Sequence, residues 1–167
     1  HEAEGKQFYI APVAEQTFRP EEDSYHSMHH HGVAFESALM AYRIYFDKKQ
    51  TIDVYAKKTP QLELNACKWY PNDQQLEEGF GDDILRVSGY IGVGACKPYD
   101  GEKMIHFDDV EYRTERIVSQ GPLRTICEIE DKGWRLNNGH RINVITRYTL
   151  YARHRDVLVE VFFSEPV

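Results

Sequence analysis

The sequence of 167 residues predicts an all-β fold, an antiparallel β-sandwich in a single domain that spans residues 1–167. Three observations lead to this class. Long segments rich in Val, Ile, Thr and Tyr recur along the chain, turn signals separate them, and only one short stretch carries helix signals. Asn137-Asn138-Gly139 is the strongest hairpin signal among the turns.

The first half of the chain predicts four strands, over residues 6–13, 33–47, 51–57 and 60–64. The second and third of these form a hairpin around a Lys-Lys-Gln turn. The one predicted helix covers residues 72–79, because Asn72 is a favourable N-cap and Gly79 a favourable terminator. The glycines at positions 81, 89, 92 and 94 are spaced too irregularly for a dinucleotide fingerprint, so we expect close strand packing or bulges there.

The second half predicts four long antiparallel strands, over residues 105–119, 123–131, 141–151 and 157–163. Strands of this length suggest large, curved sheets. Because residues 157–163 form a strong strand with apolar side chains, we expect this edge to be covered by a C-terminal remainder of the domain or by a second chain. The alternative is a smaller sandwich that is complete within these residues.

Ionisable and phenolic side chains share one face of the first hairpin. Strand side chains alternate, so Arg43, Tyr45 and Asp47 lie on one face with Asp53 and Tyr55 of the returning strand. A three-residue turn sets Tyr45 opposite Asp53 and Arg43 opposite Tyr55, and it keeps the other face apolar. This concentration of acid, base and phenol favours a substrate-facing sheet, and an ordinary solvated face is the alternative.

Composition excludes two classes of protein. The formal charge of −7 leaves no basic stripe for nucleic acid, and no apolar run approaches the roughly 20 residues that a membrane span needs. The three cysteines, at positions 67, 96 and 127, are odd in number and contain no CxxC pair. They therefore suggest neither a disulfide framework nor a zinc knuckle.

Three segments resemble the bacterial family of domain of unknown function 4861: SYHSMHHHGVAFESALMAYRIYFDKKQTIDVYAKK, WYPNDQQLEEGFGDDILRVSG and GVGACKPYDG. Members of that family tend to be encoded beside glycoside hydrolases and polysaccharide lyases. RINVITRYTLYARHRDVLVEVFF is similar in rhythm to the paired strands of galactose-mutarotase-like supersandwiches. The resemblance implies the N-terminal part of such a supersandwich, acting on oligosaccharides or polysaccharides in a periplasmic or secreted compartment. It implies no particular reaction.

The histidine-rich segment gives the first set of candidate catalytic residues. His30 or His31 could act as a general acid or base with a carboxylate from Glu36, Asp47 or Asp53. A divalent metal is a second interpretation, Zn²⁺ at the histidines or Ca²⁺ at Asp82 and Asp83, although HxxHHH has no standard zinc spacing. A loop of purely structural histidines is the third, and the sequence defines no cofactor.

The hairpin gives the second set. Tyr45 is a candidate phenolic acid or base, and Arg43 and Lys57 could hold a uronate carboxylate. Trp69 and Trp134 are sugar-stacking platforms in one interpretation and core residues in the other. The predicted catalytic residues are His30, His31, Glu36, Tyr45 and Asp53. The predicted substrate-binding residues are His29, Arg43, Asp47, Tyr55, Lys57 and Trp69.

Three classes of function follow from this sequence. The first is a carbohydrate-active enzyme, a lyase, hydrolase or epimerase that acts on an acidic or plant or algal glycan fragment. The second is a non-catalytic carbohydrate-binding module, which needs stacking aromatic residues but no coupled histidine and carboxylate. The third is the structural half of a larger sandwich.

Overall fold

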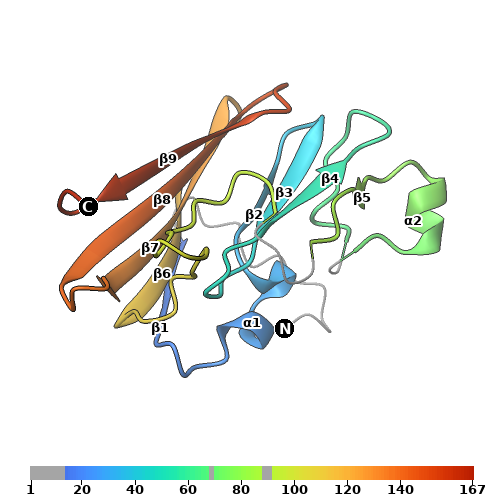
Figure 1. Ribbon diagram of the computed structural model, residues 1–167. Helices are drawn as coiled ribbons and strands as arrows, with labels where there is room; N and C mark the ends of the chain where they lie inside the picture. The colour runs from blue at the N-terminus through green and yellow to red at the C-terminus, as the bar shows by residue number, and fades with distance from the viewer. Residues whose placement is uncertain (1–13, 68–69, 88–91) are drawn as a thin grey trace.

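The computed structural model describes residues 14–67, 70–87 and 92–167, and in these residues it consists of two antiparallel sheets with little helix (Figure 1). The predicted all-β sandwich is therefore confirmed. The large sheet contains five strands in the order β1-β6-β7-β8-β9 and the small sheet contains four in the order β2-β3-β4-β5. None of the helices in the described residues is long and apolar enough to cross a bilayer.

The large sheet is formed mainly by the C-terminal half of the chain. Its strands are β1 (Ala14–Phe18), β6 (Tyr112–Gln120), β7 (Arg124–Arg135), β8 (Arg141–Tyr151) and β9 (Val157–Phe163). The last two have the predicted bounds. The predicted strand over residues 105–119 begins later, at Tyr112. The next strand continues past residue 131, because its pairing with β8 resumes at Trp134 after a bulge.

The small sheet and three short helical segments come from the first half. Its strands are β2 (Ala34–Glu36), β3 (Met40–Ile44), β4 (Ile52–Ala56) and β5 (Asp82–Asp83), and the helical segments are α1 (Ser24–Ser27), η2 (His29–His31) and α2 (Asp73–Glu77). The helix predicted over residues 72–79 is present as α2, with Asn72 and Gln75 forming a capping box. Residues 60–64 form no strand, and the strand predicted over residues 6–13 lies outside the described residues.

The prediction of one strand over residues 33–47 is wrong. The chain reverses between β2 and β3, and these strands pair with Phe35 opposite Tyr42 and Ala34 opposite Arg43. Ser37 causes the reversal, because its hydroxyl accepts hydrogen bonds from the amides of Leu39 and Met40 at 3.0 and 3.3 Å. Alternation of polar and apolar residues continues through this turn, so the pattern alone did not show it.

The predicted pairing of the next hairpin is also wrong, by two residues. Arg43 lies opposite Asp53 rather than Tyr55, because the connection is wider than three residues. Asp47 shapes the β3–β4 connection by accepting hydrogen bonds from the amides of Lys49 and Gln50 at 2.7 and 3.0 Å. The Phe46 amide donates to the His31 carbonyl instead of to β4, so pairing between β3 and β4 stops before it. A shift of two residues keeps every side chain on its predicted face.

The core lies between the two sheets. Apolar side chains from β2, β3 and β4 pack against the inner face of β7 and β8; the central members are Phe35, Ile44, Phe46, Val54, Ile129, Tyr148 and Leu150. Trp134 lies in a second buried cluster with Phe107 and Val144, so it is a core residue rather than a sugar platform. At Gly81 a Cβ would lie 2.6 Å from the Ala56 carbonyl oxygen, which confirms the close strand packing predicted for this glycine.

Candidate functional site

Arg43 is the centre of a polar cluster on the face of the small sheet that points away from the core. Its side chain is fully buried and forms an ion pair with Asp53, with Nε 2.9 Å from the carboxylate. Its Nη2 also donates to the hydroxyl oxygens of Tyr45 and Tyr70, each at 2.8 Å. The guanidinium carbon lies 4.8 Å from the ring centres of Tyr45 and Tyr70 and 5.7 Å from that of Tyr55. We call these five residues the Arg43 cluster.

Strand pairing explains how the cluster forms. The register sets Arg43 directly opposite Asp53 and the small side chain of Ala41 opposite Tyr55. Ala41 and Tyr55 also pack against Leu64, which belongs to the segment that crosses this face. The polar face predicted from alternation is therefore confirmed, but it is buried beneath a covering segment rather than exposed to solvent.

The electrostatics of the cluster keep Arg43 charged and the phenols of Tyr45 and Tyr55 protonated. Burial alone lowers the pKa of Arg43, but Tyr55, Asp53 and Tyr45 more than offset it, so the pKa is raised. Burial raises the pKa of Tyr45, and its contact with Tyr70 raises it further. Burial also raises the pKa of Tyr55. These phenols act as hydrogen-bond donors rather than as bases at neutral pH.

Tyr70 is the member of the cluster that reaches the surface. Its side chain is 45% exposed while Arg43 is fully buried, and its hydroxyl lies 3.4 Å from that of Tyr45. Sequence reasoning had selected its neighbour Trp69, which lies outside the described residues. The signal that could have identified Tyr70 is its position in the WYPND segment, beside the proposed stacking residue.

His31 extends the accessible surface of the cluster. Its ring stacks on Tyr45 with centroids 6.2 Å apart and planes 14° apart, and its carbonyl accepts the Phe46 amide. The reversal between β2 and β3 brings the histidine segment back beside the end of β3. Gly32 is needed for this approach, since a Cβ would lie 2.1 Å from the Ile44 carbonyl oxygen. A straight strand would have held His31 far from Arg43.

His29 and His30 face inward. His30 is buried, its Nε2 lies 3.2 Å from the Leu64 carbonyl, and burial lowers its pKa to about 3. His29 places Nε2 3.1 Å from the Cys67 carbonyl. Both rings therefore fasten the segment of residues 64–67, and a neutral, buried His30 is poorly suited to acid–base work near neutral pH.

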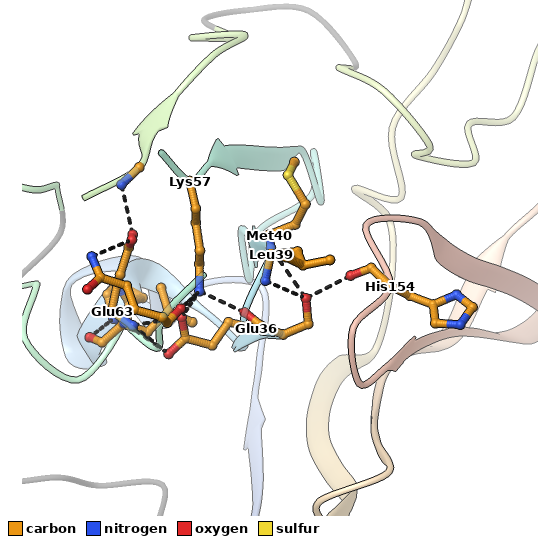
Figure 2. Close-up of polar contacts among 11 residues, drawn as sticks. Glu36, Leu39, Met40, Lys57, Glu63 and His154 are labelled. Atoms are coloured by element: carbon orange, nitrogen blue, oxygen red, sulfur yellow. Dashed lines mark hydrogen bonds and ion pairs between the residues drawn. The ribbon is translucent and has the colours of Figure 1, made fainter. Parts of the chain in front are cut away.

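Glu36 and Lys57 pair with each other in a network that holds the same covering segment (Figure 2). Glu36 accepts hydrogen bonds from the amides of Glu63 and Leu64 at 2.9–3.0 Å. Lys57 donates to the carbonyls of Ser37 and Gln61, each at 2.7 Å. Their charges are directed to backbone groups and to each other, so the geometry gives them a structural role.

The predicted carboxylates form no cation cage. Asp47 shapes the β3–β4 connection, Asp82 pairs with Arg86, and Asp83 accepts the amides of Leu85 and Arg86. Across residues 14–67, 70–87 and 92–167 no three His, Cys, Asp or Glu side chains are grouped so that they could share a metal ion.

The fold and site together define an all-β sandwich with a buried arginine that orders exposed and half-buried aromatic side chains. A family model described as "Domain of unknown function (DUF4861)" matches residues 3–167. The chain therefore belongs to this family, as its sequence segments indicated. Searches among curated proteins and among solved structures found no match.

Proposed function

We propose that the chain is a carbohydrate-active protein of bacterial polysaccharide breakdown, and that Tyr70, Tyr45 and His31 form the surface that contacts the sugar. One observation carries this proposal: a half-exposed tyrosine has its hydroxyl held by a buried arginine that also holds a second phenol. The proposal includes the periplasmic or secreted location and the supersandwich architecture that the family resemblance implies.

The arrangement suits a polar ligand with apolar faces. Aromatic rings offer an apolar surface for the C–H face of a sugar, and the phenol groups offer hydrogen bonds at its edge. Because Arg43 fixes the hydroxyls of Tyr45 and Tyr70, little side-chain freedom is lost when a ligand binds.

The charge of the cluster favours an acidic sugar over a neutral one. The protonated phenol of Tyr45 is a hydrogen-bond donor, and the buried Arg43 guanidinium behind it adds positive charge, so a uronate carboxylate is the acceptor that would gain most from this surface. Asp53 neutralises part of this charge, so we expect the preference for a uronate to be modest rather than absolute.

Catalysis is the second candidate function, and it is favoured by the contact between His31 and Tyr45. A lyase, hydrolase or epimerase needs a proton acceptor beside a proton donor. The raised pKa of Tyr45 keeps its phenol protonated and makes it a weak acid, so in this candidate function Tyr45 hydrogen-bonds the substrate and the His31 imidazole stacked on it accepts the proton.

A glycan panel tests the proposal. Neutral and uronate-containing oligosaccharides are titrated into the protein by calorimetry, with and without EDTA, while product formation is followed in parallel. Tyr70→Ala is expected to weaken binding about tenfold, which corresponds to about 1.4 kcal/mol. Tyr151→Ala is the matched control, since Tyr151 is 41% exposed against 45% for Tyr70 and lies at the end of β8, outside the Arg43 cluster.

Two results would overturn the proposal. Equal losses in both variants would show a nonspecific effect, and unchanged binding in Tyr70→Ala would place the sugar elsewhere.

Turnover that persists with EDTA and disappears in His31→Ala would favour catalysis over binding alone. Binding without turnover would favour a binding module.

A further inference from the structure

β9 is an edge strand of the large sheet. Within the described residues it pairs only with β8, in an uninterrupted register from Val144 opposite Phe163 to Leu150 opposite Val157. The Ser164 amide donates a hydrogen bond to the Asn143 carbonyl at 2.9 Å, just beyond the end of β9. This bond shows which alternate residues of β9 direct their backbone groups toward β8. By alternation, the N–H and C=O groups of Val157, Val159 and Val161 point away from β8.

An apolar pocket of about 200 Å³ lies beside this edge, between the two sheets. The small sheet contributes most of one wall and β8 and β9 contribute the other; the lining includes Phe35, Tyr42, Ile52, Val54, Tyr148 and Val159. The Tyr42 hydroxyl is engaged by the Arg155 carbonyl. The pocket therefore suits hydrocarbon rather than a sugar.

The inner face of β9 is less well covered than that of its neighbour. Val144, Tyr148 and Leu150 of β8 are buried, whereas Val157 and Val159 are only partly buried. The charged residue of the strand, Glu160, lies on the opposite face by alternation. The inward-pointing charges and prolines that commonly protect a sheet edge do not occur in β9 (VLVEVFF).

We propose that β9 is the docking edge for an extended strand of a partner polypeptide. The partner strand pairs its backbone with Val157, Val159 and Val161, and it inserts aliphatic side chains at alternate positions into the pocket. Such strand addition takes its affinity from main-chain hydrogen bonds and its selectivity from pockets for alternate side chains. A second copy is a poorer occupant, because centring two β9 strands on each other sets Glu160 against Glu160.

A defined peptide tests this on the full ¹⁵N-labelled chain. The probe is an acetylated and amidated heptapeptide of alternating threonine and valine. Its matched control carries N-methyl groups on the amides that would pair with β9. The unmodified peptide is expected to slow amide exchange at Val157, Val159 and Val161 by about tenfold, and the N-methylated peptide is expected to leave it unchanged.

Two neighbouring variants separate the faces of the strand. Val159→Asp puts a charge on the pocket side and is expected to abolish binding of the peptide, while Leu158→Asp, at a residue that is 51% exposed, is expected to keep it. The two peptides on the unaltered protein decide the matter even if Val159→Asp does not fold.

Three results would overturn the proposal. The first is an exchange rate at β9 that neither peptide changes. The second is an equal loss of peptide binding in both variants. The third is dimerisation of the chain through β9 without peptide, seen by sedimentation equilibrium, which would assign the edge to a second copy.

Discussion

Among the residues that the structure describes, two buried arginine–aspartate pairs occur, one on each sheet, and their surroundings differ. Arg43 and Asp53 have side-chain exposures of 0% and 2%, and Arg113 and Asp131 have 9% and 0%. Arg113 also donates to the Phe107 carbonyl, and Asp131 accepts from Gln50, which joins the small sheet to the large one. Arg43 instead directs its remaining donors to phenols that lead to the surface.

The comparison shows that a buried ion pair is not by itself a sign of function. What matters is which groups complete the hydrogen bonding of the guanidinium. At Arg113 backbone and side-chain groups of the protein interior complete it, so the pair is part of the scaffold. At Arg43 the exposed Tyr70 completes it, so the same chemistry becomes the support of a ligand-facing surface.

The largest expected effect comes from breaking either pair. Arg43→Met and Arg113→Met each leave a buried carboxylate without its partner, and each should lower the free energy of unfolding by about 3–5 kcal/mol. Urea unfolding measures the loss. Only Arg43→Met should also remove sugar binding, which is assayed under conditions where both variants are folded.

The double variant Arg113→Met/Asp131→Leu is the control for this prediction. Removing both charges together should recover part of the lost stability, because no buried charge is then left unpaired while the Gln50 amide loses its acceptor. A double variant as unstable as the single one, or a loss of sugar binding in Arg113→Met at full folding, would contradict the separation of the two pairs.

Glu115 shows what a buried carboxylate does without an arginine. Its Oε2 is buried with no hydrogen-bond partner in the described residues, and burial raises the pKa to about 7, opposed only by the Val33 amide. The folded state keeps the proton between about pH 4.5 and 7 while the unfolded state loses it, so this group destabilises the fold as pH rises through that window.

Glu115→Gln should therefore raise the stability at pH 8 relative to the unaltered protein by about 3 kcal/mol and have little effect at pH 4. Urea unfolding of both proteins at several pH values gives the difference directly. The difference is the useful quantity, because the buried His30 contributes a pH dependence of opposite sign. A difference that is constant with pH would contradict the assignment.

A smaller effect is expected at the Glu36–Lys57 network. Glu36→Gln removes the charge that accepts the amides of Glu63 and Leu64, and it should cost about 2 kcal/mol. Hydrogen exchange should accelerate at those two amides and not at β8. Unchanged exchange at Glu63 and Leu64 would show that this carboxylate does not hold the covering segment.

The smallest effect on stability is expected at Tyr70. Tyr70→Phe removes one acceptor of the Arg43 guanidinium, whose Nη2 keeps Tyr45 and Asp53, and it should lower the free energy of unfolding by no more than about 1 kcal/mol, measured by thermal or urea unfolding. A loss comparable to that of Arg43→Met would mean that Tyr70 belongs to the scaffold and not to a ligand-facing surface.

The sequence was sufficient for the fold class and for the composition of the polar face. Alternation placed Arg43, Tyr45, Asp53 and Tyr55 together, and alternation survives both the turn at Ser37 and the two-residue shift in pairing. The predicted number of strands is wrong over residues 33–47, because the Ser37 hydroxyl forms a turn within a segment whose residue pattern resembles a single strand. Side-chain hydrogen bonds to backbone are local and leave no periodic signal.

The candidate site was less predictable, because its burial depends on contacts between distant segments. Glu36, Lys57 and His30 have the residue types of a catalytic site, yet all three fasten the segment around residues 61–64. Tyr70 joins Arg43 across 27 positions, a pairing that no short motif encodes. Only the folded chain shows which charged groups are directed inward.

The most direct test of the account observes the tyrosine rings themselves. The protein is labelled with ¹³C in its tyrosine rings, and its spectrum is recorded during titration with the uronate and neutral oligosaccharides. The account predicts saturable shifts at Tyr45 and Tyr70 and none at Tyr151. Saturable shifts at Tyr151 with Tyr45 and Tyr70 unmoved would contradict it.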